Sequence, residues 1–380
     1  MSPSVQDKLI GVGVIGTGFM GKAHSIAYSA SASVFGTGLR PCLEIVCDLS
    51  PERASQRATD LGFSRYSDNW RDVVEDAQVQ LVSVCTPNDT HAEIAIAALA
   101  AGKHVWCEKP MSTTLADSTA MAKAAAGSTS KTIIGYNYTK NPAVTHARRL
   151  IDDGVIGRVS GFFCRYDVDN EADGNRPWSW RMSRAQSGTG ANGDVLSHVI
   201  SVAHFLTNSS ISRVVGDYAI VHKERVDGQA PDQTRIVDND DMVAALVHFE
   251  NGVKGHIGAS RVTWGRKCGL RWELHGTEGT IIYDQERLNE LKLFTRQDNP
   301  ATDGFRTILT GPLHEPYAAF LPNGGHSLGY MDVKICELHD LLYAIEANIP
   351  VWPSFSDGLK IEQVMDAVDR SAQTNKWVDV

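Results

Sequence analysis

The sequence lacks the features of several large protein classes. No apolar run reaches the ~18 residues of a membrane-spanning helix, and the opening residues, MSPSVQDK, show no signal-peptide pattern. Lys and Arg never form a block, and 36 basic residues stand against 45 acidic ones, for a formal net charge of −9. These absences argue against a membrane surface or a nucleic acid as the main partner. The sequence therefore predicts a cytoplasmic protein with a small-molecule ligand.

Cysteine usage gives no sign of a metal or redox centre. The seven cysteines are odd in number, scattered, and form no C-x-x-C pair. Most lie in apolar runs, as buried thiols do in a reducing compartment. The histidines also lack metal-ligand spacing, among them His91, His104, His275 and His339. We therefore expect no metal ion.

The strongest positive signal is the stretch from Leu9 to His24, LIGVGVIGTGFMGKAH. An apolar run predicts a buried strand, and Gly16, Gly18 and Gly21 follow it with the spacing G-x-G-x-x-G. The first glycine allows a sharp turn, the second lets the backbone approach a pyrophosphate, and the third lets the next helix pack closely. The start of that helix supplies free N–H groups and a partial positive charge. This order predicts a dinucleotide site, although the triplet alone is weak evidence.

Strands and helices alternate after this turn as far as residue 134, the pattern of a doubly wound parallel sheet. Ligands of such sheets bind beyond the carboxyl ends of the strands. We therefore expect the residues just past each strand to line one crevice: Gly16–Gly21, Asp48, 86–88, 108–110, Asn137 and Tyr138. Asp48 ends the second strand, where a carboxylate can accept hydrogen bonds from the adenosine ribose, although it could instead simply open the turn before Pro51.

The second part of the chain has a different pattern. Apolar stretches there are antiparallel in character, and Asn251-Gly252 between two of them is a strong hairpin signal. Single cores rarely exceed about 250–300 residues, so 380 residues predict two domains. We expect a Rossmann domain over 1–136 and an α+β domain over 137–380 built on a large, open, mostly antiparallel sheet. Its expected helix Gly193–Leu206 follows a flexible, glycine-rich segment.

Three titratable residues are candidates for chemistry. Lys109 follows a buried strand at the expected crevice, where an ammonium is costly without a purpose; the alternative is a lysine that extends to solvent. Asp194 and His198 lie four residues apart and so on one helical face. A carboxylate beside a histidine suits proton transfer near neutral pH, although a lone helical histidine is more often a structural residue.

Taken together, four motifs resemble those of the glucose–fructose oxidoreductase, inositol dehydrogenase and rhizopine-catabolism (Gfo/Idh/MocA) family. They are the glycine turn, Cys85-Thr86-Pro87-Asn88-Asp89-Thr90-His91, Glu108-Lys109-Pro110 and Gly193-Asp194-x-x-x-His198. The resemblance covers nearly the whole chain. Within the family the likeness is to members acting on anhydrosugars, through Pro177-x-Ser179-Trp180-Arg181, Gly188-x-Gly190-Ala191 and the terminal Trp377-Val378-Asp379-Val380. It implies NAD(P)-dependent oxidation of a secondary alcohol on a cyclic sugar or polyol, such as a levoglucosan-like anhydrosugar or related pyranose.

The resemblance also assigns roles to individual residues. Lys109, Asp194 and His198 would be catalytic. The cofactor would contact Gly16, Gly18, Phe19, Met20, Gly21, Asp48, Arg53, Thr86, Pro87, Asn88, His91, Glu108, Lys109, Asn137, Trp180 and Arg181. The substrate would contact Lys109, Asn137, Tyr138, Asp194, His198 and Tyr330. The large sheet would pair subunits into homodimers or homotetramers.

Several alternatives stay open at this point. His198 is the expected proton acceptor, with Lys109 as the competing one. NAD is expected over NADP, because the carboxylate of Asp48 would repel a 2′-phosphate, although Arg53 lies close by. An inositol 2-dehydrogenase or a keto-sugar reductase would use the same groups. A sugar-responsive regulatory protein that binds NAD should lack the lysine or the histidine, and this chain has both.

Overall fold

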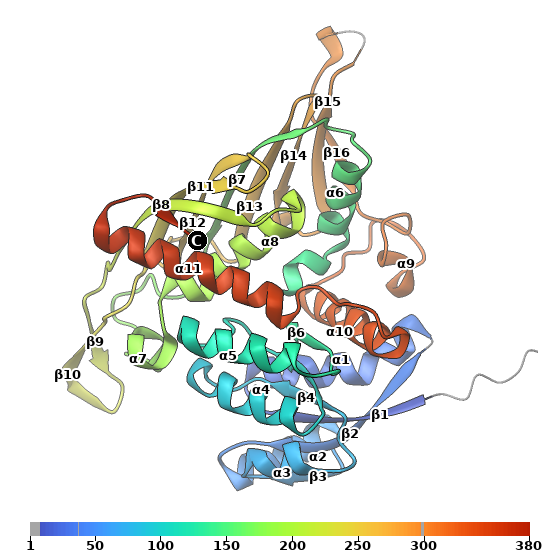
Figure 1. Cartoon of the computed structure of the whole chain (residues 1–380), viewed down its shortest axis with the longest axis vertical. Coiled ribbons are helices and arrows are strands. Elements are labelled where there is room, and N and C mark those ends of the chain that lie inside the picture. Colours follow the sequence, from blue (N-terminus) through green and yellow to red (C-terminus); the bar gives the residue numbers. More distant parts are fainter. Residues whose placement is uncertain (1–7, 37, 298–299) are drawn as a thin grey trace, which may run out of the picture. The chain divides into compact units, whose positions relative to one another are not determined.

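The structure is a computed structural model that describes residues 8–36, 38–297 and 300–380 (Figure 1). The chain divides into two compact units, Met1–Lys140 with Gly329–Leu359, and Asn141–Leu328 with Lys360–Val380. The expected boundary at residue 136 lies near the first division. The return of Gly329–Leu359 to the first unit was not predicted, because it depends on contacts with a distant part of the chain. The N-terminal residues that we searched for a signal peptide lie almost entirely outside the described ranges.

A six-stranded parallel sheet forms the centre of the first unit, in the order β3-β2-β1-β4-β5-β6. From Ile10 to Ile15, β1 is buried throughout, as expected for a strand covered on both faces. The doubly wound fold predicted from the alternating pattern is thereby confirmed. The strands are β1 (Lys8–Ile15), β2 (Leu39–Cys47), β3 (Arg65–Ser67), β4 (Leu81–Val84), β5 (His104–Cys107) and β6 (Thr132–Ile134).

Polar side chains cap the starts of α2 and α5 in this unit. Ser50 accepts a hydrogen bond from the backbone N–H of Arg53 and Pro51 is the first helical residue of α2, while Thr114 caps α5 in the same way. The helical elements are α1 (Phe19–Phe35), α2 (Pro51–Leu61), α3 (Trp70–Glu75), η1 (Asn88–Thr90), α4 (His91–Ala100), α5 (Leu115–Ala126), η2 (Asn137–Lys140) and α10 (Tyr330–Ala347).

The end of α1 corrects one prediction. The stretch Ser33-Val34-Phe35-Gly36-Thr37-Gly38, followed by Pro41, is typical of a loop in the sequence. In the structure the helix instead continues to Phe35 and ends at Gly36, which has a φ of 74°. The ring of Phe35 stacks on His339 of α10, with ring centroids 3.7 Å apart. A contact with a remote segment thus extends the helix beyond its local pattern. Residue 37 of the expected loop lies outside the described ranges.

A nine-stranded sheet dominates the second unit, in the order β16-β15-β14-β13-β7-β12-β11-β8-β17. Among the described strand pairs of this sheet, β7 with β12 is parallel and the others are antiparallel, so the expected mostly antiparallel sheet is confirmed. The predicted hairpin turn at Asn251-Gly252 joins β11 to β12, and Gly252 has a φ of 87°. The strands are β7 (Val159–Asp167), β8 (Ile211–Ala219), β11 (Met242–Phe249), β12 (Lys254–Ser260), β13 (Gly269–Gly276), β14 (Gly279–Asp284), β15 (Glu290–Thr295), β16 (Arg306–Leu309) and β17 (Val378–Asp379).

Helices cover one face of this sheet, with α8 packed on β7 and β12 and α6 against β15. Burial alternates along β11, so every second side chain points away from the helices. A separate two-stranded sheet, β9 (Glu224–Asp227) with β10 (Ala230–Ile236), was not predicted. The helical elements are α6 (Pro142–Asp152), η3 (Trp180–Met182), α7 (Arg184–Ser187), η4 (Asn192–Leu196), α8 (Ser197–Thr207), η5 (Gln285–Arg287), η6 (Pro300–Thr302), α9 (Tyr317–Phe320) and α11 (Phe355–Thr374), which runs across the second division of the chain.

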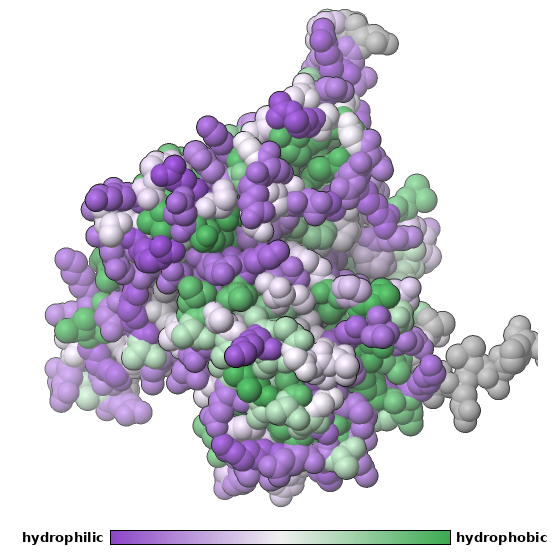
Figure 2. Space-filling model, viewed as in Figure 1, coloured by the Kyte–Doolittle hydropathy of each residue, from purple (hydrophilic) through white to green (hydrophobic). Residues whose placement is uncertain are grey.

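Figure 2 shows hydrophobic residues in separate patches among hydrophilic ones on the visible face. Within the described ranges, no helix combines the length and apolar character needed to cross a membrane.

Candidate active site

In the first unit, the three glycines of the turn after β1 each meet a different steric demand. Gly16 has a φ of 93°, and a Cβ on it would lie 2.5 Å from the carbonyl oxygen of Cys85. A Cβ on Gly21 would lie 1.9 Å from the carbonyl oxygen of Gly16, so this glycine lets α1 pack on the turn. At Gly18, no heavy atom of the described residues lies within 4 Å of the Cβ position. Gly18 also precedes α1 without capping it by a side chain, so the backbone there is open to a ligand.

Asp48 lies directly after β2 and is tied to this glycine turn. Its Oδ2 accepts hydrogen bonds from the hydroxyl and the backbone N–H of Thr17, and its Oδ1 accepts one from the backbone N–H of Ser50. The Nε of Arg53 lies 3.2 Å from Oδ1. Burial acts to raise the pKa of Asp48, but these hydrogen bonds and the guanidinium together lower it below its usual value. Asp48 is therefore an ionised acceptor held beside the turn.

His91 and Glu108 are buried residues near the ends of β4 and β5. The ring of His91 is buried between two backbone carbonyls, with Nε2 at 2.9 Å from the oxygen of Thr86 and Nδ1 at 3.0 Å from that of Pro110. It thus links the turn after β4 to the turn that carries Lys109. We expected His91 and Glu108 to contact the cofactor, and the structure gives both of them buried protein partners instead of an open face.

A buried charge network surrounds Glu108. The Nζ of Lys334, on α10, lies 2.6 Å from Glu108 Oε1 and 2.8 Å from Glu337 Oε2, and all three residues are buried. His24 Nε2 lies 2.9 Å from the same Glu108 oxygen, and the indole N–H of Trp106 donates to Glu337 Oε2 at 3.0 Å. We call Lys334, Glu337, Glu108, His24 and Trp106 the β5 network. It holds the residue next to Lys109 in a fixed, charged environment.

The two carboxyl groups of the β5 network differ in acidity. Burial opposes ionisation of both, but Glu108 faces Lys334 and His24 together, which holds its pKa well below the usual value. Glu337 also faces Lys334, but the negative charge of Glu108 opposes its ionisation. Burial therefore has the larger effect and raises the pKa of Glu337 to about 7. Burial also lowers the pKa of His24 to about 4, so its ring is neutral at pH 7. Its Nε2–H must then donate to Glu108, and Nδ1 accepts from Ser83 at 3.0 Å.

Aromatic and amide side chains gather at the start of α1 and α10. The ring of Tyr330 lies 5.6 Å from that of Phe19 and 6.3 Å from that of Tyr138, and its hydroxyl contacts the sulfur of Met20 at 3.4 Å. These four expected contact residues are therefore neighbours. Asn137 is buried, and its Nδ2 has no hydrogen-bond partner among the described residues. A buried amide in this state is a suitable donor for a bound ligand.

The second unit carries the remaining candidates. Asp194 lies in η4, a wide π-helical turn of five residues, and His198 follows in the first turn of α8. The predicted helix is therefore present, but its first turn is wider than an α-helix, a feature often found at functional sites. His198 is nearly buried with its ring 5.8 Å from that of Tyr166, whereas Asp194 is half-buried. The guanidinium of Arg181 stacks on the ring of Trp180 at 4.4 Å.

Each expected residue thus has a place in one of the two units. The first unit holds Gly16, Gly18, Phe19, Met20, Gly21, Asp48, Arg53, Thr86, Pro87, Asn88, His91, Glu108, Lys109, Asn137, Tyr138 and Tyr330; the second holds Trp180, Arg181, Asp194 and His198. Sequence reasoning missed Lys334, Glu337 and His24. The local signal for them is a polar or charged side chain at a helix position that the apolar pattern assigns to the core.

The first unit fits a dinucleotide. The backbone at Gly18 is open, the N-terminus of α1 lacks a side-chain cap, and an ionised Asp48 follows the neighbouring strand. In the part of the chain that the structure describes, no group of three or more His, Cys, Asp or Glu side chains is arranged to hold a metal ion.

Comparisons with known proteins agree with this geometry. Residues 10–136 match the family described as an oxidoreductase family with an NAD-binding Rossmann fold, and residues 144–282 match the GFO/IDH/MocA C-terminal domain. The chain is 38% identical to levoglucosan dehydrogenase of Pseudarthrobacter phenanthrenivorans over 98% of both chains. It is 26% identical to inositol 2-dehydrogenase of Rhizobium meliloti over 97% of this chain and 98% of that protein.

Solved structures give the same result. Levoglucosan dehydrogenase in complex with NADH and levoglucosan superimposes with a TM-score of 0.95 at 38% identity, covering 98% of this chain and all of that one. An NAD-binding oxidoreductase from Klebsiella pneumoniae superimposes with a TM-score of 0.94 at 39% identity, covering 98% and 99%.

Proposed function

Because the chain belongs to the GFO/IDH/MocA oxidoreductase family, we propose that it oxidises a secondary hydroxyl of a cyclic sugar to a keto sugar with NAD⁺. The substrate that we propose is an anhydrosugar like levoglucosan or a related pyranose. The observation that carries this proposal is the edge of the parallel sheet in the first unit. There the open glycine turn, the ionised Asp48 and the turn bearing Lys109 follow the carboxyl ends of β1, β2 and β5 of the same parallel sheet.

Bound NAD⁺ supplies the hydride acceptor. The turn at Gly18 and the N-terminus of α1 hold its pyrophosphate, and Asp48 accepts hydrogen bonds from the adenosine ribose. Asn137 offers its free amide N–H groups to the ligand. Trp180 and Arg181 form a stacked pair that we assign to the cofactor as well.

Three residues act on the sugar in this proposal. His198 removes the proton from the reacting hydroxyl, because an imidazole is a base near neutral pH. Lys109 donates a hydrogen bond to the same oxygen and stabilises the charge that develops on it. Asp194 orients the imidazole and binds a neighbouring hydroxyl. The competing assignment makes Lys109 the base and leaves His198 to bind the substrate.

A screen of purified protein tests the proposal. Levoglucosan, pyranoses and inositols are offered with NAD⁺ at alkaline pH, and NADH formation is followed by absorbance; keto sugars with NADH test the reverse direction. We expect turnover with an anhydrosugar or a related pyranose. Fastest turnover of an inositol would reassign the substrate. Binding of NADH without turnover of any sugar in either direction would favour a regulatory protein and refute the proposed activity.

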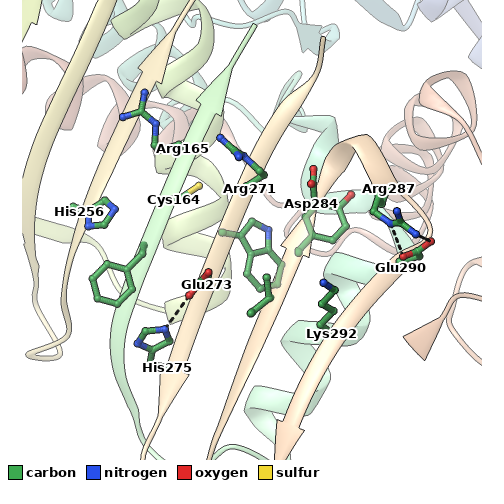
Figure 3. Close-up of a pocket in the computed structure, with 14 residues that line it drawn as sticks. Cys164, Arg165, His256, Arg271, Glu273, His275, Asp284, Arg287, Glu290 and Lys292 are labelled. Carbon is green, nitrogen blue, oxygen red and sulfur yellow. Dashed lines mark hydrogen bonds and ion pairs between the residues drawn. The ribbon is translucent and has the colours of Figure 1, made fainter. Parts of the chain in front are cut away.

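The open face of the nine-stranded sheet supports a homodimer or homotetramer as part of the proposal. A hollow of about 550 Å³ lies on this face (Figure 3), and its side chains stand in front of the strands while helices lie behind them. Basic and acidic groups alternate there, among them Arg165, Glu273 and Lys292, and Leu246 of the same face is 54% exposed. A second copy can pair such a self-complementary surface. Light scattering tests this, and Leu246→Asp should raise the monomer fraction.

We also place the activity in the cytoplasm, where scattered cysteines of this kind stay reduced.

A further inference from the structure

Four buried polar residues of the second unit meet at one edge of the nine-stranded sheet. Asn239, Asp240 and Asp241 directly precede β11, and Arg261 directly follows β12. Because Met242 pairs with Ser260 in the antiparallel register, the two segments lie at the same edge. Each of the four side chains is at most 2% exposed. We call these four residues the anchor cluster.

Asp240 caps the helical segment that carries Asp194. Its Oδ1 accepts a hydrogen bond from the N–H of Gly190 at 2.8 Å, and its Oδ2 accepts one from Asn192 at 2.6 Å. Its own carbonyl oxygen accepts the N–H of Ala191 at 2.8 Å. Three successive N–H groups at the start of a helical segment, which have no acceptor within the helix, are thus bound by a single residue. A carboxylate is also favoured at the positive end of a helix.

Two further contacts fix this segment. A Cβ on Gly190 would lie 1.8 Å from the carbonyl oxygen of Asp240, so only glycine permits this approach. The side-chain amide of Asn192 donates to the carbonyl oxygen of Met365, on α11, at 3.0 Å. The wide turn that leads to Asp194 and His198 is therefore held from two directions by residues remote in sequence.

The other members of the anchor cluster hold the segment that carries Trp180 and Arg181. Asn239 Nδ2 donates to the carbonyl oxygen of Arg181 at 2.7 Å, and Arg261 Nη1 donates to the same oxygen at 3.1 Å. Arg261 is itself fixed, because its Nη2 donates to Asn239 Oδ1 at 2.6 Å and its Nε to Asp241 Oδ1 at 3.0 Å. Two donors on one carbonyl leave little freedom for the backbone at residue 181.

We propose that the anchor cluster positions Asp194 and His198 for the reaction, through Asp240, and positions Arg181 through Asn239 and Arg261. This inference rests on the proposed function. Its members are positioning residues, since they act through the backbone of the segments that they hold. A displacement of about 1 Å at a reacting group can cost about 10²-fold in rate. Loss of the hydrogen bonds of Asp240 should therefore slow the chemical step far more than it weakens the binding of NADH. Loss of those to the Arg181 carbonyl should affect both, because Arg181 is assigned to the cofactor.

The test compares Asp240→Asn with Asp232→Asn, the same change at an exposed residue of β10. In the first variant an amide N–H₂ replaces one accepting oxygen, so either Gly190 or Asn192 loses its acceptor. Hydrogen exchange measured by mass spectrometry should then show faster exchange at residues 190–194. With levoglucosan, or with the sugar that the wild type oxidises fastest, kcat should fall about 10²-fold. The NADH dissociation constant should change little, whereas the thermal midpoint should fall because a buried N–H loses its acceptor. Asp232→Asn should match the wild type in every measurement.

The isotope effect separates positioning from a structural role. If the reacting groups are displaced, hydride transfer becomes slower relative to product release, so the deuterium isotope effect on kcat should rise with a sugar deuterated at the reacting carbon. Faster exchange with unchanged kcat would overturn the inference, as would unchanged exchange at residues 190–194.

A second variant covers the case in which Asp240→Asn does not fold. Asn239→Ala removes one donor from the Arg181 carbonyl and leaves the contacts of Asp240 in place. Exchange near residue 181 should rise and kcat should fall, and an unchanged kcat would again overturn the inference. If the wild type turns over no sugar at all, the proposed function fails, and the positioning of reacting groups by the anchor cluster fails with it. The exchange measurements then still decide whether Asp240 holds the segment.

Discussion

Replacing Glu337 by Gln should make the first unit more stable at pH 8 but not at pH 5. Glu337 is buried in the β5 network, where Oε2 accepts hydrogen bonds from Lys334 and Trp106. Its Oε1 has no hydrogen-bond partner among the residues that the structure describes. A glutamine can keep the accepting oxygen and place its N–H₂ at Oε1, so it resembles the protonated acid in shape and charge. The variant therefore fixes the network in its neutral-glutamate form at every pH.

The magnitude follows from the shift in acidity. Burial raises the pKa of Glu337 from 4.5 to about 7, and one pKa unit corresponds to about 1.4 kcal/mol, so the shift is worth about 3 kcal/mol. Between these two pH values the folded state binds the proton and the unfolded state does not. The contribution of Glu337 to the free energy of unfolding is therefore largest below pH 4.5 and falls as the pH rises towards 7. Above pH 7 it no longer changes. The pKa of Glu108 is shifted the opposite way, so its contribution is lost only as the pH falls below about 4.5.

Urea unfolding at pH 5 and pH 8 measures the effect, with the transition of each unit fitted separately because such chains need not unfold in one step. Many groups titrate between these values, including His24, but they contribute equally to both proteins and cancel in the difference. Glu346→Gln is the matched control, since Glu346 is an exposed residue of the same helix. We compare the free energy of unfolding of Glu337→Gln with that of the wild type at each pH. This difference should rise in favour of the variant by about 3 kcal/mol from pH 5 to pH 8. A difference that does not change with pH would refute the assignment of a raised pKa to Glu337.

The remaining predictions concern the reaction. NAD⁺ should give a higher kcat/KM than NADP⁺, because the carboxylate of Asp48 repels a 2′-phosphate, and a measured preference for NADP⁺ would contradict this. Lys109→Ala should lower kcat by at least about 10²-fold with little change in NADH affinity by fluorescence titration, since the ammonium acts on charge that develops in the transition state; near-normal turnover would mean that Lys109 is structural. His198→Asn should flatten the acid limb of the pH–rate profile. If that limb instead survives in His198→Asn and disappears in Lys109→Met, the two roles must be exchanged.

The sequence predicts those parts of the fold that local patterns determine. The buried run of β1, the glycine turn after it and the hairpin at Asn251-Gly252 each depend on a few adjacent residues, and the structure has all three. The apolar stretches His104–Cys107 and Val159–Asp167 likewise predict strands, and β5 and β7 have the same bounds. Lys109 after β5 was identified as a candidate for the same reason, because the end of a buried strand can be recognised locally.

The parts that escaped prediction depend on contacts between remote segments. The strands β15 and β16 are paired in the sheet, but they have only six and four residues, so the short alternation of β15 was not enough to identify it. The segment Gly329–Leu359 joins the first unit through α10, whose partners lie in α1 and the β5 network. Asp240 caps a helical segment that begins about 50 residues earlier. None of these pairings leaves a periodic signal in the sequence.

In both units a buried polar group holds the backbone beside a candidate catalytic residue. This feature bears on the choice between an enzyme and a sugar-responsive binding protein. Lys109 and Asp194 are half-buried and open in part, but the backbone beside each is held by a fully buried polar group, Glu108 in one unit and Asp240 in the other. Burying such groups costs free energy that apolar side chains of similar volume would not. A protein that only binds a sugar needs a less exact arrangement than one that must transfer a proton and a hydride. The two buried networks therefore favour catalysis more strongly than the presence of Lys109 and His198 alone. They also identify two positions, 334 and 240, at which a change should lower kcat more than it weakens binding.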